Sequence, residues 1–491
     1  EALQRLALIG PNARDTCIQG GGSARVPPHR QVSVLEALRE RAEGRFELLF
    51  EPGCTSHRAL PLLRAESVAL PDGGGEGLRM QLFDSLDPTG EPRLTRTTRS
   101  FEQVWIASPA AGIPAQFSAR LEGRFTARET GVHHFALTTA GRGRLRVDGE
   151  LVVDLWHETE RGEAFFGLGG PERTAPVRLE AGQTVALRVD YSRQGAPFLG
   201  GLRLGHLPPH PEDAMERAEA AARDADAAVV VVGLNADWET EGRDRESWAL
   251  PGRQAELVER VAAANPRTVV VMNAGAPVDL APAEEAPALL WAWYPGQEAG
   301  HALADLLFGD AEPGGRLPTT FPVRLEDTPS FPFHPGRDGR VVYGEGVFAG
   351  YRHYDAKGLE PRFAFGSGLG YTRFEFSDLE LSATSASLED LPLEAHVTLR
   401  NVGDRMGSEV VQLYVHDPQA RVPRPEQELR AFAKLRLAPG EARRVRLGLP
   451  ERAFAFWEKG SGWVVEPGDY EIRVGRCSRD LPLRARLQVR G

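Results

Sequence analysis

A cluster of acidic residues follows one of the most apolar segments of the chain. Residues 226–234, DAAVVVVGL, are typical of a strand buried on both faces, and Asp237, Glu239 and Glu241 come soon after it. Open α/β sheets bind ligands outside the carboxyl ends of their strands, where loops converge. Carboxylates at that edge are therefore well placed to face a crevice.

The same residues allow a purely structural interpretation. Arg243 and Arg245 follow Glu241 closely enough to form an ion pair within the loop. Charged loops are usually solvated surface, so spacing alone favours this second interpretation.

The segments before this loop have the pattern of an α/β domain. Residues 5–10 form an apolar run, a glycine-rich loop follows at 20–28, and residues 33–42 have apolar positions at helical spacing before a second strand at 46–53. The glycine-rich loop lacks the spacing of a phosphate-binding loop. We expect it to form a tight turn at a strand's carboxyl end that reaches the site.

The segment after residue 76 alternates apolar and polar residues, which indicates an all-β insertion, and the α/β pattern resumes at 211–309. We expect the strands that flank the insertion to pair with each other. The predicted fold class is a multidomain α/β sandwich with a mostly parallel sheet, interrupted by a β sandwich or barrel and followed by a second β sandwich. The predicted order is α/β sandwich, first part, 1–70; inserted β module, 71–208; α/β sandwich, second part, 209–325; connector, 326–375; β sandwich, 376–491.

Composition limits the classes of partner. The chain has 491 residues and a net charge of -11, and no basic run stands out, so we expect neither a nucleic-acid nor a membrane partner. Cys17, Cys54 and Cys477 lack metal-ligand spacing, and we expect buried thiols, no metal and no cofactor. The chain opens without Met and almost at once with a strand, as expected of a piece of a longer protein.

Several motifs resemble the C-terminal region of glycoside hydrolase family 3 β-glucosidases, in family order over almost the whole chain outside the insertion. The matching segments are 8-LIGPNA-13, 20-GGGSARV-26, 241-EGRDR-245, 250-LPGRQ-254, 273-NAGAPV-278, 293-WYPGQEAG-300, 343-YGEGVFAGYRHYD-355 and 363-FAFGSGLGYTRFEF-376. The insertion resembles a protective-antigen-14-type β module through 144-RLRVDGELVVDLW-156. The tail resembles a fibronectin type III-like domain through 466-EPGDYEIRVG-475.

The resemblance implies a retaining mechanism, in which one carboxylate is the nucleophile and a second acts as acid and then as base. It implies that Glu241, the Glu before Gly-x-Asp-Arg, is the acid/base, with Glu239 as the second candidate. The family's nucleophile is an Asp on a (β/α)8 barrel that normally precedes this region, and the sequence has no such alternation. The chain would hold half of the catalytic pair and would be inactive alone.

Other residues are candidates for supporting roles. An acid must not face nearby cations, because these favour the carboxylate, so we expect Arg245 to pair with Asp244 or another acid and to support the loop. Ser23 in the glycine-rich loop is a substrate-binding candidate. Phe165 and Phe166 lie in a predicted loop of the insertion, where they would either stack on a sugar or an aglycone, or fill the core.

Two functions fit these observations. The first is part of a retaining exo-β-glycosidase that hydrolyses terminal non-reducing β-D-glucosyl residues, with this chain supplying the acid/base and the aglycone-side wall. Its partners would be a β-linked oligosaccharide or glycoside and the missing barrel. The alternative is a non-catalytic carbohydrate-binding or adhesion protein, which has no reason to keep 241-EGRDR-245 in an α/β frame. We interpret 293-WYPG-296 as a core and turn element.

Overall fold

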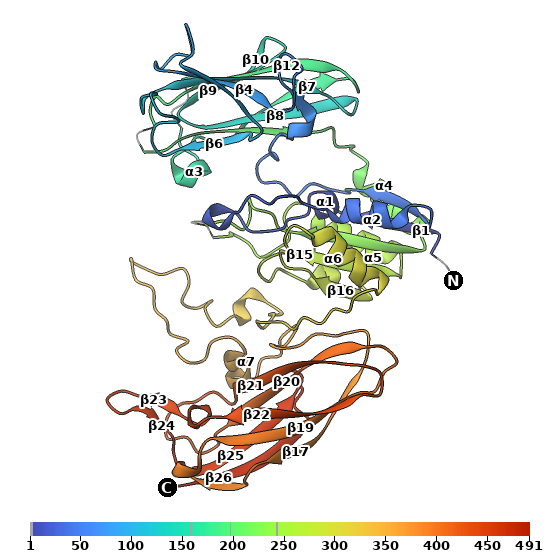
Figure 1. Cartoon of the computed structure of the whole chain (residues 1–491), viewed down its shortest axis with the longest axis vertical. Coiled ribbons are helices and arrows are strands. Elements are labelled where there is room, and N and C mark those ends of the chain that lie inside the picture. Colours follow the sequence, from blue (N-terminus) through green and yellow to red (C-terminus); the bar gives the residue numbers. More distant parts are fainter. Residues whose placement is uncertain (1–2, 158–159, 197, 242–243) are drawn as a thin grey trace.

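The computed structural model describes residues 3–157, 160–196, 198–241 and 244–491. Three bodies follow one another along the long axis of the molecule, a β body at one end, an α/β body in the middle and a second β body at the other end (Figure 1). This arrangement confirms the predicted multidomain fold class.

The middle body is built on a parallel sheet. Its strands are β1 (Arg5–Ile9), β2 (Glu47–Glu51), β14 (Ala227–Gly233), β15 (Thr268–Asn273) and β16 (Ala288–Trp291), in the order β16-β15-β14-β1-β2. All neighbouring pairs in that order are parallel. Parallel strands end at the same edge, so the loops after β1, β14, β15 and β16 converge.

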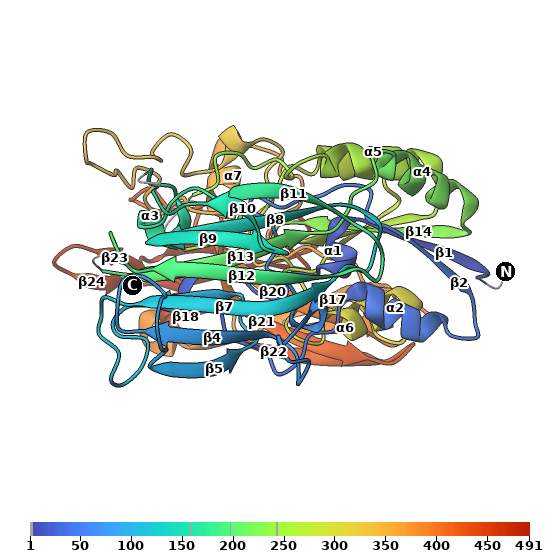
Figure 2. The same ribbon diagram turned by 90° about the horizontal axis from the view of Figure 1, so that it is seen from above.

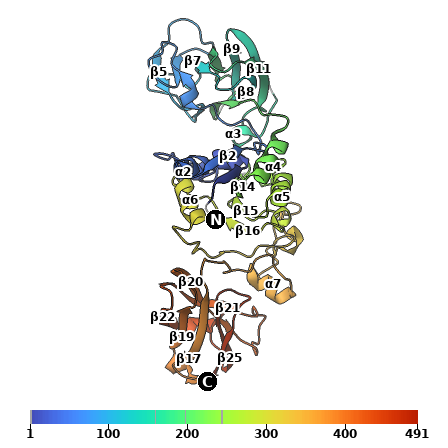
Figure 3. The same cartoon turned by 90° about the vertical axis from the view of Figure 1, so that its right-hand side faces the viewer.

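Helices cover both faces of this sheet. Helices α2 (Val34–Ala42) and α6 (Ala299–Phe308) lie on one face, and α4 (Ala214–Asp224) and α5 (Gln254–Ala264) lie on the other (Figures 2 and 3). Alternate residues of β14 enter the two cores, Val231 on the α2 side and Val232 on the α5 side. This explains why the central strands are apolar without alternation. Each helix in the described ranges is too short or too polar to cross a bilayer.

The β body between β2 and β14 has two facing sheets around a core that includes Phe117, Phe125 and Phe135. One sheet has the order β10-β9-β12-β7-β4-β5, with β3 paired to β7, and the other has the order β11-β8-β13-β6. The elements are β3 (Val68–Ala69), β4 (Leu78–Phe83), β5 (Leu94–Thr98), β6 (Glu102–Trp105), β7 (Ser118–Thr126), β8 (Gly131–Ala140), β9 (Arg142–Val147), β10 (Glu150–Asp154), α3 (Ala164–Gly167), β11 (Arg173–Leu179), β12 (Thr184–Ser192) and β13 (Gly200–Leu207).

The flanking strands β2 and β14 do not pair with each other, so that expectation was wrong. Both pair with β1, which lies between them in the sheet. The chain leaves the sheet at its edge strand β2 and returns next to β1, so the insertion separates two strands that share a neighbour.

An irregular connector joins the middle body to the second β body. It contains the short helix α7 (Tyr351–Lys357), and residues 331–344 form no helix or strand. The C-terminal sandwich has sheets of order β17-β19-β22 and β18-β26-β25-β20-β21, and a separate hairpin β23-β24. Its strands are β17 (Phe374–Leu381), β18 (Ser385–Ser387), β19 (Leu393–Asn401), β20 (Gly407–His416), β21 (Glu428–Leu437), β22 (Ala442–Leu449), β23 (Phe456–Glu458), β24 (Gly462–Val464), β25 (Gly468–Gly475) and β26 (Leu483–Arg490).

Candidate active site

Asn273, the last residue of β15, fixes the backbone where the strand-end loops converge. Its side chain is 1% exposed. Its Nδ2 donates to the carbonyls of Cys17 at 2.9 Å and Trp293 at 2.6 Å, and its Oδ1 accepts from the Cys17 amide at 2.9 Å and Asn12 Nδ2 at 3.1 Å. One amide side chain therefore joins the loops after β1 and β16 to the end of β15.

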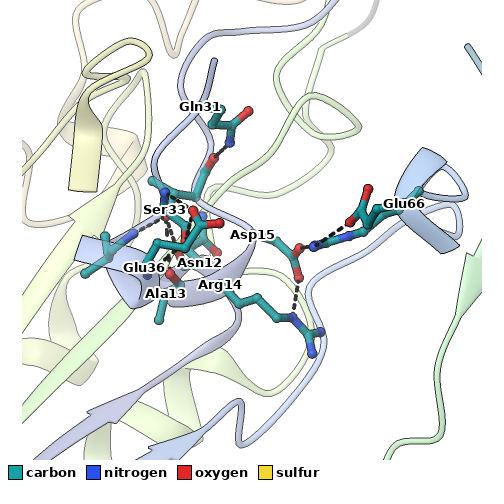
Figure 4. Close-up of polar contacts among 11 residues, drawn as sticks. Asn12, Ala13, Arg14, Asp15, Gln31, Ser33, Glu36 and Glu66 are labelled. Atoms are coloured by element: carbon teal, nitrogen blue, oxygen red, sulfur yellow. Dashed lines mark hydrogen bonds and ion pairs between the residues drawn. The ribbon is translucent and has the colours of Figure 1, made fainter. Parts of the chain in front are cut away.

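The loop after β1 is held at both of its ends. Asp15 pairs with Arg14 and Arg64, and Gln31 donates to the Thr16 carbonyl at 2.7 Å (Figure 4). At the far end of the loop, Ser33 begins α2 with a capping box: its Oγ accepts from the Glu36 amide, and Glu36 accepts from the Ser33 amide. The glycine-rich segment lies between these two fixed points.

Glu241 meets this glycine-rich segment. Its Oε2 accepts a hydrogen bond from the Ser23 amide at 3.0 Å, and the carboxyl group is exposed. Contacts with the Ser23 hydroxyl and amide hold the pKa of Glu241 below its usual value, because they stabilise the carboxylate. Gly22 allows this approach, since it has a φ of +74° and a Cβ there would lie 2.6 Å from Glu241 Cβ.

Glu239 points to other loops. Its Oε2 accepts from the Gly275 amide at 2.7 Å and from the Tyr294 hydroxyl, and its backbone carbonyl accepts from the Gly21 amide at 2.8 Å. Burial, followed by the bond to Glu239, raises the pKa of Tyr294, so the phenol is neutral. Cys17 lies in the same environment, and burial raises the pKa of its thiol to about 11. The two glutamates thus have different surroundings although one residue separates them.

The predicted pairing of Arg245 with an acid is wrong within the described residues. Arg245 donates to the Pro277 carbonyl at 3.1 Å, and Asp244 lies 3.3 Å from Nε2 of His334 in the connector. The two residues are adjacent in sequence but contact different segments. Arg243 lies outside the described residues.

Three further predicted residues are Ser23, in the glycine-rich loop of the α/β body, and Phe165 and Phe166, in the insertion. Ser23 meets Glu241 through its amide, as above. Phe165 and Phe166 form part of α3, and a Cβ at Gly201 of β13 would lie 2.6 Å from the Phe165 ring, so Phe165 packs on the sheet. Phe166 is 70% exposed. The Phe165 ring therefore packs on strand β13, while the Phe166 ring is exposed at the surface of the insertion.

The insertion contacts the same loops. Arg203 of β13 lies 3.7 Å from Asp237 in the loop after β14 and 3.0 Å from Glu172, and Arg25 of the glycine-rich loop lies 3.3 Å from Glu102 of β6. Arg203 and Glu172 are largely buried, so this ion pair is shielded from solvent. The insertion is thereby fixed beside the loops that carry Glu241 and Ser23.

The sequence did not predict the roles of Asn273 and Tyr294 or the contact between Arg203 and Asp237. Asn273 was detectable as the polar end of the otherwise apolar run TVVVMN. Tyr294 was interpreted only as part of a core and turn element. Its neighbour Trp293 does pack on Trp291 and Phe321, but Tyr294 itself turns to Glu239. The described residues contain no group of three or more His, Cys, Asp or Glu arranged to hold a metal ion.

Comparisons with known proteins identify what this arrangement resembles. Residues 1–371 match the glycosyl hydrolase family 3 C-terminal domain, and residues 409–478 match a fibronectin type III-like domain. A β-glucosidase of Rhizobium radiobacter is 40% identical over 98% of this chain and 58% of its own length. A probable β-glucosidase I of Aspergillus terreus is 36% identical over 97% of this chain and 59% of its own.

Solved structures show the same likeness. The β-glucosidase of Kluyveromyces marxianus in complex with glucose superposes with a TM-score of 0.90 at 34% identity, over 99% of this chain and 59% of that one. DesR, a β-glucosidase of Streptomyces venezuelae in complex with D-glucose, gives 0.67 at 28% identity, over 99% and 56%. The chain thus spans less than two thirds of the relatives that it matches.

Proposed function

Since this chain belongs to glycoside hydrolase family 3, we propose that it is part of a retaining, exo-acting β-glucosidase-like enzyme that hydrolyses terminal non-reducing β-D-glucosyl residues. The relatives from Rhizobium radiobacter and Aspergillus terreus are named β-glucosidases, and the Kluyveromyces marxianus structure holds glucose. The observation that carries the proposal is the exposed carboxyl group of Glu241, held by the Ser23 amide at 3.0 Å where the strand-end loops converge.

Glu241 is the proposed general acid/base. In the first step it protonates the leaving oxygen while a nucleophilic carboxylate attacks the anomeric carbon, and in the second it takes a proton from the attacking water. Its lowered pKa in this chain suits the base step. A second carboxylate about 5 to 5.5 Å away, together with exclusion of water, would raise that pKa for the acid step.

The nucleophile belongs, in this proposal, to a (β/α)8 barrel outside this chain. The chain spans 58% of the length of the Rhizobium radiobacter relative, which leaves room for a further body. The connector supports such a body, because Val341, Val342 and Tyr343 are 59%, 60% and 82% exposed within an irregular segment. Clustered exposed apolar side chains mark surfaces that meet another body.

The inserted β body, in this proposal a protective-antigen-14-type module, forms the wall on the leaving-group side. Support comes from the ion pairs of Arg25 with Glu102 and of Arg203 with Asp237, which join the insertion to the loops near Glu241, and from the exposed ring of Phe166. An aromatic ring there can stack on an apolar aglycone or on a second sugar.

The test replaces Glu241 by Ala in the complete protein. Hydrolysis of glucosides with poor leaving groups should fall by about 10²- to 10⁴-fold, because these need protonation as the bond breaks. Aryl glucosides with good leaving groups should lose less, and azide should restore turnover by attacking the glycosyl-enzyme without base assistance. Equal losses for both substrates without azide rescue would transfer the role to Glu239 or elsewhere.

The matched control is this chain alone, which should show no turnover of an aryl β-glucoside since it lacks the nucleophile. Turnover by the 491-residue chain, with its mass verified, would refute the divided site. A complete protein that binds β-glucans but hydrolyses no glucoside would instead support the non-catalytic alternative.

A further inference from the structure

We infer that Glu239 is a positioning residue for the loop that carries Glu241, with Tyr294 as its principal partner, and that it is not a second acid/base. This inference rests on the proposed role of Glu241. We call Glu239, Tyr294 and Gly275 the Glu239 anchor.

The contacts of Glu239 run to the loops after β1, β15 and β16. The Glu239 carboxylate binds the amide of Gly275 after β15 and the hydroxyl of Tyr294 after β16, while its carbonyl binds the amide of Gly21 after β1. A residue with three such contacts cannot shift without disturbing three loops. Glu241 lies two residues further along, so its position follows from this attachment.

The surrounding backbone is shaped for these contacts. Trp293 has a φ of +54°, which is costly for a bulky residue, and this turn directs Tyr294 toward Glu239. The Asn273 side chain holds Trp293 in place by donating a hydrogen bond to the Trp293 carbonyl. A Cβ at Gly275 would lie 2.8 Å from Glu239 Oε2 and 2.8 Å from Tyr294 Cε2, so only glycine allows the carboxylate to approach.

Glu241 differs in the respects that matter for proton transfer. It is exposed and its carboxyl group meets one loop, through Ser23, whereas Glu239 is partly buried and its Oε2 receives two donors. A group that exchanges protons with substrate needs an accessible oxygen. A group that holds a loop needs fixed partners, which describes Glu239.

The test measures the pH dependence of kcat/KM in the complete protein. Glu239→Ala should lower kcat/KM for a poor leaving group by about 10- to 100-fold, because misplacing an acid by about 1 Å has effects of that size. Glu239→Gln, which keeps an acceptor oxygen, should lose less than about 10-fold, and its alkaline limb should persist because Glu241 still titrates. Tyr294→Phe should cost little further in the Glu239→Ala background. Glu246→Gln, which removes an exposed acid from the same loop, is the matched control.

Three results would overturn the inference. The first is loss of the alkaline limb in Glu239→Gln, which would make Glu239 the acid. The second is azide rescue of Glu239→Ala comparable to that of Glu241→Ala. The third is kcat/KM within twofold of the parent for both Glu239→Ala and Tyr294→Phe.

Amide hydrogen exchange on this chain alone tests the Glu239 anchor independently of the proposed function, because it does not depend on activity. Glu239→Ala should speed exchange of the Gly275 amide directly, and of the Gly21 amide through loosening of the loop. Unchanged exchange at Gly21 would overturn the anchor whatever the activities show. Full activity with an intact alkaline limb in Glu241→Gln would refute the role of Glu241 while leaving the exchange result valid.

Discussion

Replacing Asn273 by Ala should destabilise the α/β body by about 3 kcal/mol. The substitution removes four hydrogen bonds, to the Cys17 amide and carbonyl, the Trp293 carbonyl and Asn12 Nδ2, at 2.6 to 3.1 Å. Each bond is worth about 1 kcal/mol net, so the four together contribute about 4 kcal/mol. Water entering the vacated space can replace about one of the lost partners, which leaves about 3 kcal/mol.

The assay is amide hydrogen exchange of β15, since a chain with several bodies does not unfold in one step. A loss of about 3 kcal/mol corresponds to exchange about 100-fold faster for amides that open with this body. Asn265→Ala is the matched control, because that side chain is also buried and donates to the carbonyls of Ala222 and Ala225 at 2.8 and 2.9 Å, away from the strand-end loops. Both variants should speed amide exchange in β15. Only Asn273→Ala should speed exchange of the Cys17 amide by a larger factor than it speeds exchange in β15. A loss below about 1 kcal/mol, or equal loosening at Cys17 in both variants, would refute the role assigned to Asn273.

Two other predictions concern the inserted body. Replacing residues 77–206 by a short Gly/Ser linker in the complete protein should change kcat/KM among aglycones and oligosaccharide lengths but not the preferred terminal sugar, because the proposed leaving-group wall includes Arg203 and Phe166. An unchanged aglycone profile with lost binding to an insoluble β-glucan would make the insertion a targeting module instead. Burial, followed by the adjacent His133, lowers the pKa of His206 to about 3 from its ordinary 6.5, so the unfolded chain binds one more proton between these values. The stability of the inserted body should therefore fall as the pH drops below about 6.5, by at most about 1.4 kcal/mol per pH unit from this group. His206→Gln should reduce the dependence of the thermal unfolding temperature on pH. An unchanged dependence would contradict the burial of a neutral imidazole.

The sequence was sufficient to predict those features of the fold that depend on local patterns of apolar and polar residues. Strands β14 and β15 were predictable because parallel strands covered by helices on both faces are apolar throughout, as in VVVV and TVVVM. The insertion was predictable because period-two alternation replaces that pattern. The position of Glu241 at a strand-end loop followed from the apolar run at 226–234, which ends shortly before it.

The contacts of individual loop residues could not be predicted in the same way. Asp244 and Arg245 are adjacent, yet they contact His334 and Pro277, which lie far away in the sequence. Opposite charges predict an ion pair only when the backbone lets the side chains meet. The direction of Tyr294 could not be predicted, because a core and turn element does not show which side chain faces the strand-end loops; the positive φ of Trp293 belongs to the turn that brings Tyr294 to Glu239.

Glu241 is ionised and exposed in this chain, which agrees with the proposed division of the catalytic pair between two bodies. Contacts with Ser23 lower its pKa, and solvent lies on its other side, so it lacks the surroundings that make a carboxyl group an acid. Covering it with a second body would remove that solvent and bring a nucleophilic carboxylate close, and both changes favour the protonated form. The loops that hold Glu241 are already joined by Asn273 and Glu239 without the second body. Assembly would therefore change the charge of Glu241 more than its position, and the acid would form only where a nucleophile is present to use it.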